Sequence, residues 1–401
     1  MSRKNFGLGF YRSNQVAAGM LPDFPISSNL FIAFKGEAVS HNHLAKLILF
    51  LALLLSTVAD VGQLRVTQQR AMTFKTWSAS ASPNEVSAPA LNPVVYRHIA
   101  QVVWVVSDID AVVDYWQRLG IRNIHRDGIV EFPNLTYHGK PDPATAKQVT
   151  ARVADLEIKW IQPVHGGKFW SEILRQRGDG IRAIGYNTQS PAEFDRQIKY
   201  FAAKGVGVVV EDRWIGRNGH GRIAYLDTAA QGGGNTLALI DDPDTHAHEQ
   251  DANQYPLTKI THFAWVVNDV RQVDAYYTSL GFKPFSAIDH NISLDRVYRG
   301  QPGIFEMWLG WDRTGDAPLE WVQQITGPDV YVEYGKKHGE GFHHVGINVN
   351  DMDEAVKLMT ARGAPAAQDA SWKASKGKGR AVYLDTDPHG GVTLELIYDP
   401  H

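Results

Sequence analysis

Two histidines and two glutamates occupy positions where side chains of these types are unusual. His262 and His344 each open an apolar stretch typical of a strand, and Glu320 and Glu395 lie inside two other apolar strands. A lone carboxylate in a buried strand is unfavourable unless a cation or a hydrogen-bond donor compensates it. Imidazole nitrogens and carboxylate oxygens are together ligands of divalent transition metals. The four residues therefore predict a metal site, provided that the fold brings their strands together.

An internal repeat predicts the elements that position these residues. From about residue 95 onward the chain follows one plan twice: WVVSD begins at Trp104 and WVVND begins at Trp265, 161 residues later. Farther along, YLDT at 225–228 matches YLDT at 383–386 with a separation of 158 residues, so the second copy is shorter by a small loop deletion. Repeated matches at nearly one separation indicate a duplication.

Each copy divides again into two units of one strand, one helix and about three strands. In the last unit, Met352, Ala355, Val356 and Met359 fall at helical spacing after the strand opened by His344. Four such units account for the chain beyond the first ninety or so residues. They cover residues 96–168, 178–243, 257–327 and 339–400.

This βαβββ unit, paired twice, resembles the vicinal oxygen chelate superfamily, which includes glyoxalase I, methylmalonyl-CoA epimerase, bleomycin-resistance proteins and extradiol dioxygenases. The resemblance covers about three quarters of the chain, and GFHHVGINVND at 341–351 and GGVTLELI at 390–397 carry it best. It implies an α+β fold, the glyoxalase/dioxygenase fold, in which the four units pair into two cup-shaped mixed β-sheet domains. It also implies one divalent metal ion in a cup, held by the first and last strands of each unit.

In this chain the resemblance places the metal on His262, Glu320, His344 and Glu395. The repeat gives the N-terminal copy no such set, because lysine is a cation and alanine offers no ligand. We therefore expect a domain 94–248 without a metal site and a domain 249–401 with one. The aligned pairs are His262 and Gln101, Glu320 and Lys159, His344 and Ala183, and Glu395 and Ala238.

Strand alternation predicts which side chains share a face with the ligands, since residues i and i+2 point to the same side. His262 is expected to share a face with Ala264, and His344 with Gly346. Such small neighbours leave room beside each ligand. His343 is expected on the opposite face, as a structural residue.

Two histidines and two carboxylates around a six-coordinate ion leave two neighbouring positions for a substrate that binds through oxygen. The ion then acts as a Lewis acid for negative charge that develops on oxygen, as in an enolate. By resemblance, a metal-bound glutamate acts as the general base, here Glu395 or Glu320. We expect Zn, Ni, Co or Mn and a non-redox proton transfer, which means an isomerase, epimerase or lyase.

Ring cleavage by an Fe(II) extradiol dioxygenase is the second hypothesis. The resemblance then implies a triad of His262, His344 and Glu395, with an N-terminal half that holds no metal. Against this, Glu320 fills a position that should stay open. A small-molecule binding or resistance protein is the third hypothesis, and it suits the N-terminal half best.

Candidate substrate contacts are aromatic and basic side chains of the C-terminal copy. Trp308, Trp311 and Tyr298 suit an aromatic small molecule, although aromatic residues in strands commonly belong to the core. Tyr383 falls near the active-site tyrosine of the resembling dioxygenases. Arg380 ends a basic loop that could hold an anionic group.

Composition limits the class of partner. The 401 residues carry a formal net charge of -3, and 44% are hydrophobic. This balance indicates an ordinary globular chain that acts on a small molecule, with no nucleic-acid partner, no expected membrane association, and a monomeric or homodimeric state. The absence of cysteine excludes disulfides, thiolate ligands and a cysteine nucleophile.

Residues 1–93 differ from the repeat and predict a leader followed by a flexible linker. The apolar run LILFLALLL is shorter than the about 20 residues that span a bilayer. Its length suits the core of a signal peptide within residues 44–60. Alternatively, the true start is Met72 and the upstream part is a translation artefact. We expect a cytoplasmic protein, and a periplasmic or secreted one if residues 44–60 act as a signal peptide.

Overall fold

The computed structural model describes residues 90–244 and 256–400. The predicted leader, with its segment 44–60 and Met72, lies outside these ranges. No helix in the described part of the chain is long and apolar enough to span a bilayer.

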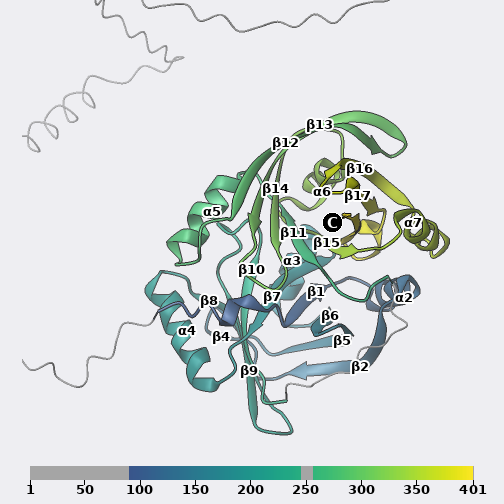
Figure 1. The fold of residues 1–401 in the computed structure, drawn as a ribbon. Coiled ribbons are helices and arrows are strands. Elements are labelled where there is room, and N and C mark those ends of the chain that lie inside the picture. Colours follow the sequence, from purple (N-terminus) through teal and green to yellow (C-terminus); the bar gives the residue numbers. More distant parts are fainter. Residues whose placement is uncertain (1–89, 245–255, 401) are drawn as a thin grey trace, which may run out of the picture. The chain divides into compact units, whose positions relative to one another are not determined.

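The N-terminal half forms an open, curled mixed sheet with the strand order β2-β5-β6-β1-β7-β10-β9-β8-β3-β4. Figure 1 shows this sheet in blue and teal. The short 3-10 helix η1 (Val95–Arg97) precedes it. The first unit comprises β1 (Gln101–Val105), α2 (Ile109–Leu119), β2 (Arg122–Phe132), the hairpin β3 (Thr136–Tyr137) and β4 (Lys140–Pro141), β5 (Ala144–Val153) and β6 (Leu156–His165). Helix α3 (Lys168–Arg177) leads to the second unit, which comprises β7 (Gly180–Asn187), α4 (Pro191–Ala203), β8 (Val208–Ile215), β9 (His220–Leu226) and β10 (Thr236–Asp241).

The C-terminal half forms a closed barrel with the strand order β11-β14-β13-β12-β16-β17-β18-β15. The third unit comprises β11 (His262–Val266), α5 (Val270–Ser279), β12 (Ala287–Tyr298), β13 (Gln301–Asp312) and β14 (Leu319–Thr326). Helix α6 (Val330–His338) leads to the fourth unit, which comprises β15 (Gly341–Asn348), α7 (Met352–Ala361), β16 (Ala366–Ala374), β17 (Gly377–Leu384), the 3-10 helix η2 (Asp387–His389) and β18 (Thr393–Tyr398). The predicted α+β fold of four βαβββ units in two cup-shaped domains is confirmed.

The two cups differ at one edge. In the C-terminal half, the end of β12 pairs with β16 through Val297 and Asp369 and through Tyr298 and Gln368, which closes the barrel. In the N-terminal half, the β3–β4 hairpin pairs with β8 at the corresponding edge, and the sheet stays open. The repeat predicts two similar cups, but the pairing of these edge strands makes one closed and one open.

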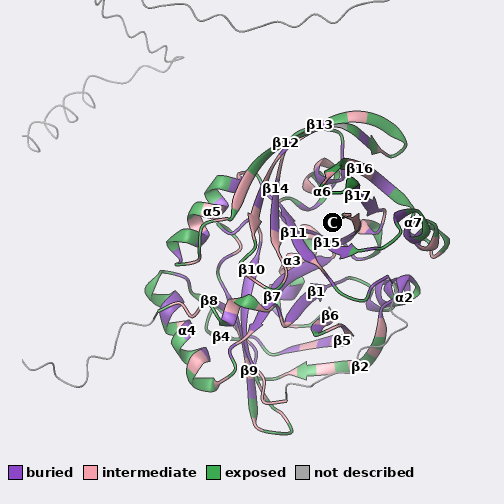
Figure 2. Ribbon diagram, in the orientation of Figure 1, coloured by how far each residue is buried: buried purple, intermediate pink, exposed green. Residues whose placement is uncertain are grey.

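The two halves share one hydrophobic core, into which both contribute central strands. Figure 2 shows β1, β7 and β15 largely buried. Contacts across the interface follow the repeat: Arg177 Nε donates to the carbonyl of His338, and Nδ1 of His338 lies 2.7 Å from the carbonyl of Arg177. Positions 177 and 338 are related by the same 161 residues as the other matches. The halves therefore meet at this point through residues that are related by the repeat.

Asp387 on η2 supports this interface through His338, which lies 3.0 Å from its carboxylate, and through Lys337 at 2.6 Å. Burial alone would raise the pKa of Asp387, but its hydrogen bonds with His338 and Lys337 outweigh burial and lower the pKa from 3.8 to about 2. A carboxyl group whose pKa is lowered in the folded state stabilises the fold above its unfolded pKa. That contribution disappears as the pH falls through the folded value.

Asp387→Asn is therefore expected to lower the free energy of unfolding by about 2 kcal/mol at neutral pH. The difference from the wild type should shrink as the pH falls from about 4 to about 2. Urea unfolding across this range measures it. As a control, Asp114→Asn breaks an exposed pair with Arg126 and should change the free energy by less than about 1 kcal/mol. Equal stability of Asp387→Asn and the wild type at neutral pH would contradict the assignment.

Candidate metal centre

The four predicted ligands lie together on the inner face of the C-terminal barrel. His262 on β11 and His344 on β15 belong to neighbouring antiparallel strands. Strand β14 runs parallel to β11 and places Glu320 beside Ala264. Strand β18 runs parallel to β15 and places Glu395 beside Gly346. The four strands are consecutive neighbours in the barrel, and Figure 1 labels three of them, β14, β11 and β15. All four side chains are buried, with residue exposures of 0–6%.

Their ligand atoms are spaced as a common ion requires. His262 Nε2 lies 3.0 Å from His344 Nε2, and Glu395 Oε2 lies 2.9 Å and 3.2 Å from these two nitrogens. Glu320 Oε2 is more distant, at 3.4 Å from His344 and 3.8 Å from His262. Ligand atoms bound about 2.1 Å from one metal at right angles lie about 3 Å apart. The ligand atoms of His262, His344 and Glu395 could therefore hold a divalent ion, and Glu320 lies somewhat farther from them.

The charges of the cluster also suit a divalent cation. Burial disfavours a charged His344, but the carboxylates of Glu395 and Glu320 outweigh burial and raise its pKa to about 9. Burial would likewise raise the pKa of Glu395, but His344 and His262 hold it well below its ordinary value. Two buried carboxylates thus need positive charge from their surroundings. With neutral imidazoles, their two negative charges match a divalent cation.

Gly346 supplies the space that His262 needs. A Cβ atom at this position would lie 1.9 Å from Cε1 and 2.1 Å from Nδ1 of His262. Gly346, which was predicted to share a face with His344, thus contacts the ring of His262. Any side chain here must displace the imidazole.

Gly346→Ala is therefore expected to weaken metal binding by about 10- to 100-fold, the range found when the supports of ligands are altered. Titration of the metal-free protein with Zn²⁺ or Mn²⁺, followed by calorimetry, measures the change. The repeat offers a matched control in Gly185→Ala, where the new Cβ would meet the end of the Ile240 side chain at 2.6 Å. An unchanged affinity in Gly346→Ala, or an equal loss in both variants, would contradict this role.

His343 lies on the same side as His344, so the prediction of an opposite face is wrong. The register of β15 against β11 shifts between the pairs of Ala264 and Trp265, which leaves His343 as an extra residue in β15. Such a bulge interrupts the alternation of side chains. Nδ1 of His343 accordingly lies 2.8 Å from Nδ1 of His344. His343 therefore contacts the candidate ligand His344 directly.

The structure separates the predicted substrate contacts into two groups. Trp311 lies beside the cluster, with its ring centroid 6.1 Å from that of His262, and Tyr383 lies 5.3 Å from His344. The side chain of Trp308 points to the opposite face of β13, where its ring stacks on that of His290 with the ring centroids 4.6 Å apart.

Tyr298 and Arg380 are occupied elsewhere. The hydroxyl of Tyr298 donates to Glu333 on α6, at 2.7 Å. Arg380 pairs with Asp369 on β16 and Asp353 on α7, outside the barrel. The structure thus brings neither residue to the ligand cluster.

Two inward residues were not predicted. The hydroxyl of Tyr331 lies 2.7 Å from that of Tyr383, and its ring centroid is 6.3 Å from that of His344. Arg296 is only 8% exposed, and its guanidinium lies over Phe305. No sequence signal singled out Arg296, because its strand β12 (AIDHNISLDRVY) carries several other polar residues. Tyr331 belongs to the helix between the units, and no sequence pattern links it to the ligands.

Comparison with known proteins assigns the family. The chain belongs to the glyoxalase/bleomycin resistance protein/dioxygenase superfamily, whose family model matches residues 100–225 and 261–383, once in each half. A search of curated proteins finds no match to the sequence.

The chain is similar to several solved structures. A variant of 4-hydroxymandelate synthase from Streptomyces coelicolor superposes with a TM-score of 0.51 at 12% identity, covering 76% of this chain and 92% of that one. The Mn(II)-bound glyoxalase from Novosphingobium aromaticivorans has a TM-score of 0.43 at 16% identity, covering 75% and 82%. A catechol 2,3-dioxygenase has a TM-score of 0.38 at 14% identity, covering 76% and 94%. At such identities the likeness concerns the fold alone.

Proposed function

We propose that this protein is a metal-dependent enzyme that catalyses proton transfer on a small substrate that binds through oxygen, as an isomerase, epimerase or lyase. The metal centre belongs to domain 249–401, and domain 94–248 lacks one. The observation that carries the proposal is the fourth candidate ligand: Glu320 Oε2 lies 3.4 Å from His344 Nε2. The set of His262, Glu320, His344 and Glu395 leaves two positions of a six-coordinate ion for the substrate. We also propose a cytoplasmic monomer or homodimer.

The residues divide the chemistry among them. A bound Zn, Ni, Co or Mn ion supplies Lewis acidity for negative charge on a substrate oxygen. His262, His344 and Glu395 hold the site, because their ligand atoms are the closest to one another. Glu320, with the longest contacts, is the carboxylate that can loosen most easily and accept a substrate proton at Oε2. Protonated Glu320 then returns the proton to a neighbouring carbon or to the leaving group.

Residues around the cluster exclude water and orient the substrate. Burial, and next the carboxylate of Glu395, raise the pKa of Tyr383, so its hydroxyl stays protonated as a hydrogen-bond donor. Trp311 gives the site an apolar edge beside His262. A flat or aromatic substrate fits these surroundings.

A second candidate function is ring cleavage by an Fe(II) dioxygenase. The specific observation in its favour is that His262, His344 and Glu395 form a compact group by themselves, with ligand atoms within 4.8 Å of one another. Two histidines and one carboxylate are the ligand set of non-haem Fe(II) oxygenases. In this case Glu320 is not a ligand.

Metal content of the full chain, purified without oxygen, tests the proposal. About one Zn, Ni, Co or Mn per chain, together with turnover of isomerase or lyase substrates in the absence of oxygen, is the expected result. About one Fe(II) per chain with oxygen consumption on catechols would overturn it in favour of ring cleavage. A chain that binds none of these ions when each is supplied would overturn both functions.

A further inference from the structure

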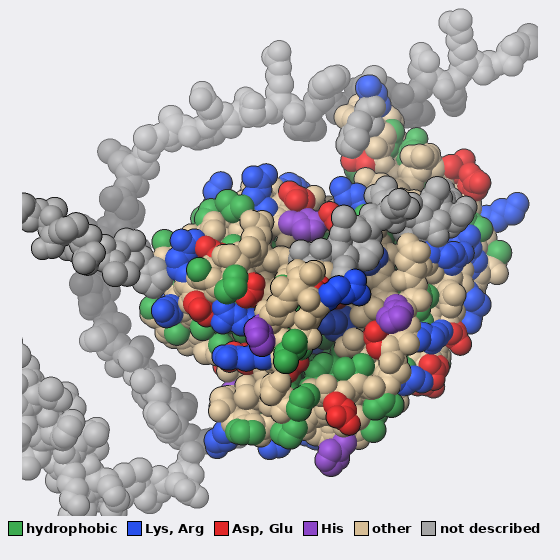
Figure 3. Space-filling model, turned by 90° about the horizontal axis from the view of Figure 1, so that it is seen from below, with side chains coloured by type: hydrophobic (Ala, Val, Ile, Leu, Met, Phe, Trp, Pro, Cys, Tyr) green, Lys and Arg blue, Asp and Glu red, His purple; other side chains and the backbone are tan. Residues whose placement is uncertain are grey.

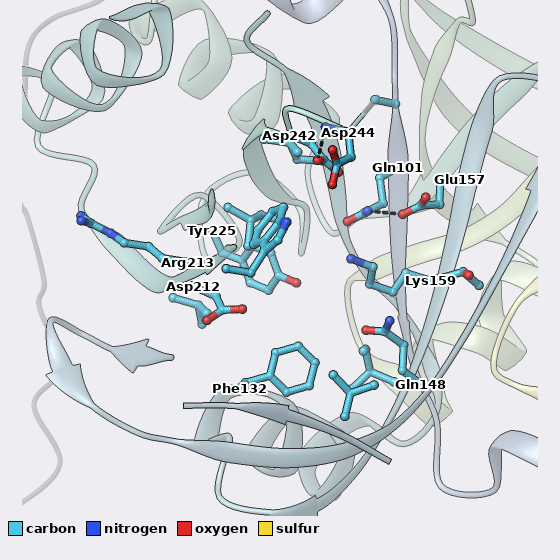
Figure 4. Close-up of a pocket in the computed structure, with 18 of the residues that line it drawn as sticks. Gln101, Phe132, Gln148, Glu157, Lys159, Asp212, Arg213, Tyr225, Asp242 and Asp244 are labelled. Carbon is cyan, nitrogen blue, oxygen red and sulfur yellow. Dashed lines mark hydrogen bonds between the residues drawn. The ribbon is translucent and has the colours of Figure 1, made fainter. Parts of the chain in front are cut away.

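The open N-terminal sheet contains a cavity of about 940 Å³. This volume lies in the range of small-molecule sites. Four positions that align with the metal ligands belong to this half, and two of them, Gln101 and Lys159, line the cavity. Figure 4 shows Gln101, Lys159 and Glu157 along one wall, with Asp212 and Tyr225 across from them. The cavity therefore occupies in this cup the place that the metal centre occupies in the other.

A difference in side-chain size contributes to the hollow in this cup. Thr150 on β5 lines the cavity, and its repeat partner 161 residues later is Trp311, which lies beside His262 in the other cup. A threonine in place of a tryptophan leaves much of that volume unfilled. Together with the open edge of the sheet, this leaves room for a ligand.

Polar groups in the cavity wall have unused bonding capacity. Lys159, at the position of Glu320, forms no hydrogen bond or salt bridge among the described residues, and its charge acts on the carboxyl group of Asp212 across the cavity. Gln101, at the position of His262, is 6% exposed and donates to Glu157, but its Oε1 has no partner in the described chain. Asp212 on β8 is 7% exposed, and its Oδ1 is likewise unpartnered in that part. Buried polar atoms are nearly always bonded, so these atoms indicate a ligand or water.

The rest of the lining is apolar and aromatic. Phe132, Trp170, Trp214 and Tyr225 all face the cavity. Aromatic walls of this kind favour a flat ring. Figure 3 shows acidic and basic side chains interspersed on one surface of the molecule.

We propose that the N-terminal cavity is a metal-independent binding site for a small aromatic acid, whose acidic oxygens bind Lys159 and whose hydroxyl or amino group, at the other end, donates to Asp212. The lysine ammonium gives the positive charge that a metal gives in the other cup, and it is a fixed charge that needs no cofactor. The site binds its ligand without catalysing a reaction. None of the four residues of this half that align with the metal ligands is a base beside a metal ion. The inference does not depend on the function proposed for the metal centre.

Calorimetric titration of the full chain with three probes tests the proposal: 4-hydroxybenzoate, 4-hydroxyphenylacetate and 4-aminobenzoate. At least one is expected to bind with a dissociation constant below about 1 mM. Binding should persist in His344→Ala, which removes a candidate metal ligand. It should weaken by about tenfold or more in Thr150→Trp, which introduces the residue of the other cup at a position that lines the cavity.

Lys159→Gln separates recognition from folding. This variant should weaken the binding of the acids by about tenfold. Its affinity for the uncharged 4-hydroxybenzamide should stay within about twofold of that of the wild type. Thermal unfolding and circular dichroism establish that the variants are folded. The proposal is overturned if no probe binds, if binding is lost in His344→Ala but kept in Thr150→Trp, or if Lys159→Gln weakens acid and amide equally.

Discussion

His344→Ala is expected to reduce bound divalent metal from about one ion per chain to less than about one tenth, and to lower turnover by about 10³-fold or more. His344 is central because its Nε2 lies within 3.4 Å of ligand atoms of His262, Glu320 and Glu395. Its removal also leaves two buried carboxylates with one fewer compensating partner. Loss of Lewis-acid stabilisation is worth several kcal/mol in the transition state, which corresponds to about three orders of magnitude in rate.

Elemental analysis after dialysis, with turnover measured on the same sample, gives both quantities. His290→Ala is the matched control: His290 is a partly exposed histidine that pairs with Glu306 on the neighbouring strand. It should retain full metal and nearly full turnover. If His344→Ala kept its metal, the ion would have to bind elsewhere, and the assignment of the centre would be wrong.

The second large effect is a contrast between two glutamates. Glu395→Gln should release most of the metal, because Glu395 Oε2 lies 2.9 Å and 3.2 Å from the two histidine nitrogens. Glu320→Gln should retain at least half of the metal, since its contacts are longer. If Glu320 is the general base, turnover in this variant should nevertheless fall by about 10²- to 10⁴-fold. Glutamine preserves the shape of the side chain but accepts no proton under these conditions.

Metal content and single-turnover rates of both variants separate the two candidate functions. For ring cleavage by Fe(II), Glu320 is not a ligand, and Glu320→Gln should then keep its iron and its rate within about tenfold. Loss of metal from Glu320→Gln equal to that from Glu395→Gln would instead make both glutamates permanent ligands. The base would then have to be sought among other groups of the barrel.

The proposed ligand cluster was recognisable in the sequence because two independent local patterns meet there. The separation of 161 residues aligns two copies of one plan, and the ligand types occur in only one of them. The structure brings His262, His344 and Glu395 into one compact group, with Glu320 at 3.4 Å from His344, and the family match covers both copies. The relative directions of side chains within one strand can also be obtained from the sequence. Trp308 and Trp311 are three residues apart on β13, so strand alternation points them to opposite faces.

The sequence by itself determined the duplication, the four βαβββ units and the residue types at the ligand positions, because periodicity and repeated spacing are properties of the linear chain. Only the tertiary structure decided the register between strands. The bulge in β15 turns His343 towards His344, and the pairing of β12 with β16 closes one barrel while the other cup stays open. Arg296 and Tyr331 join the site from a strand and a helix that become neighbours only after folding. Bulges and edge pairings depend on contacts between distant segments, and such contacts leave little trace in local sequence.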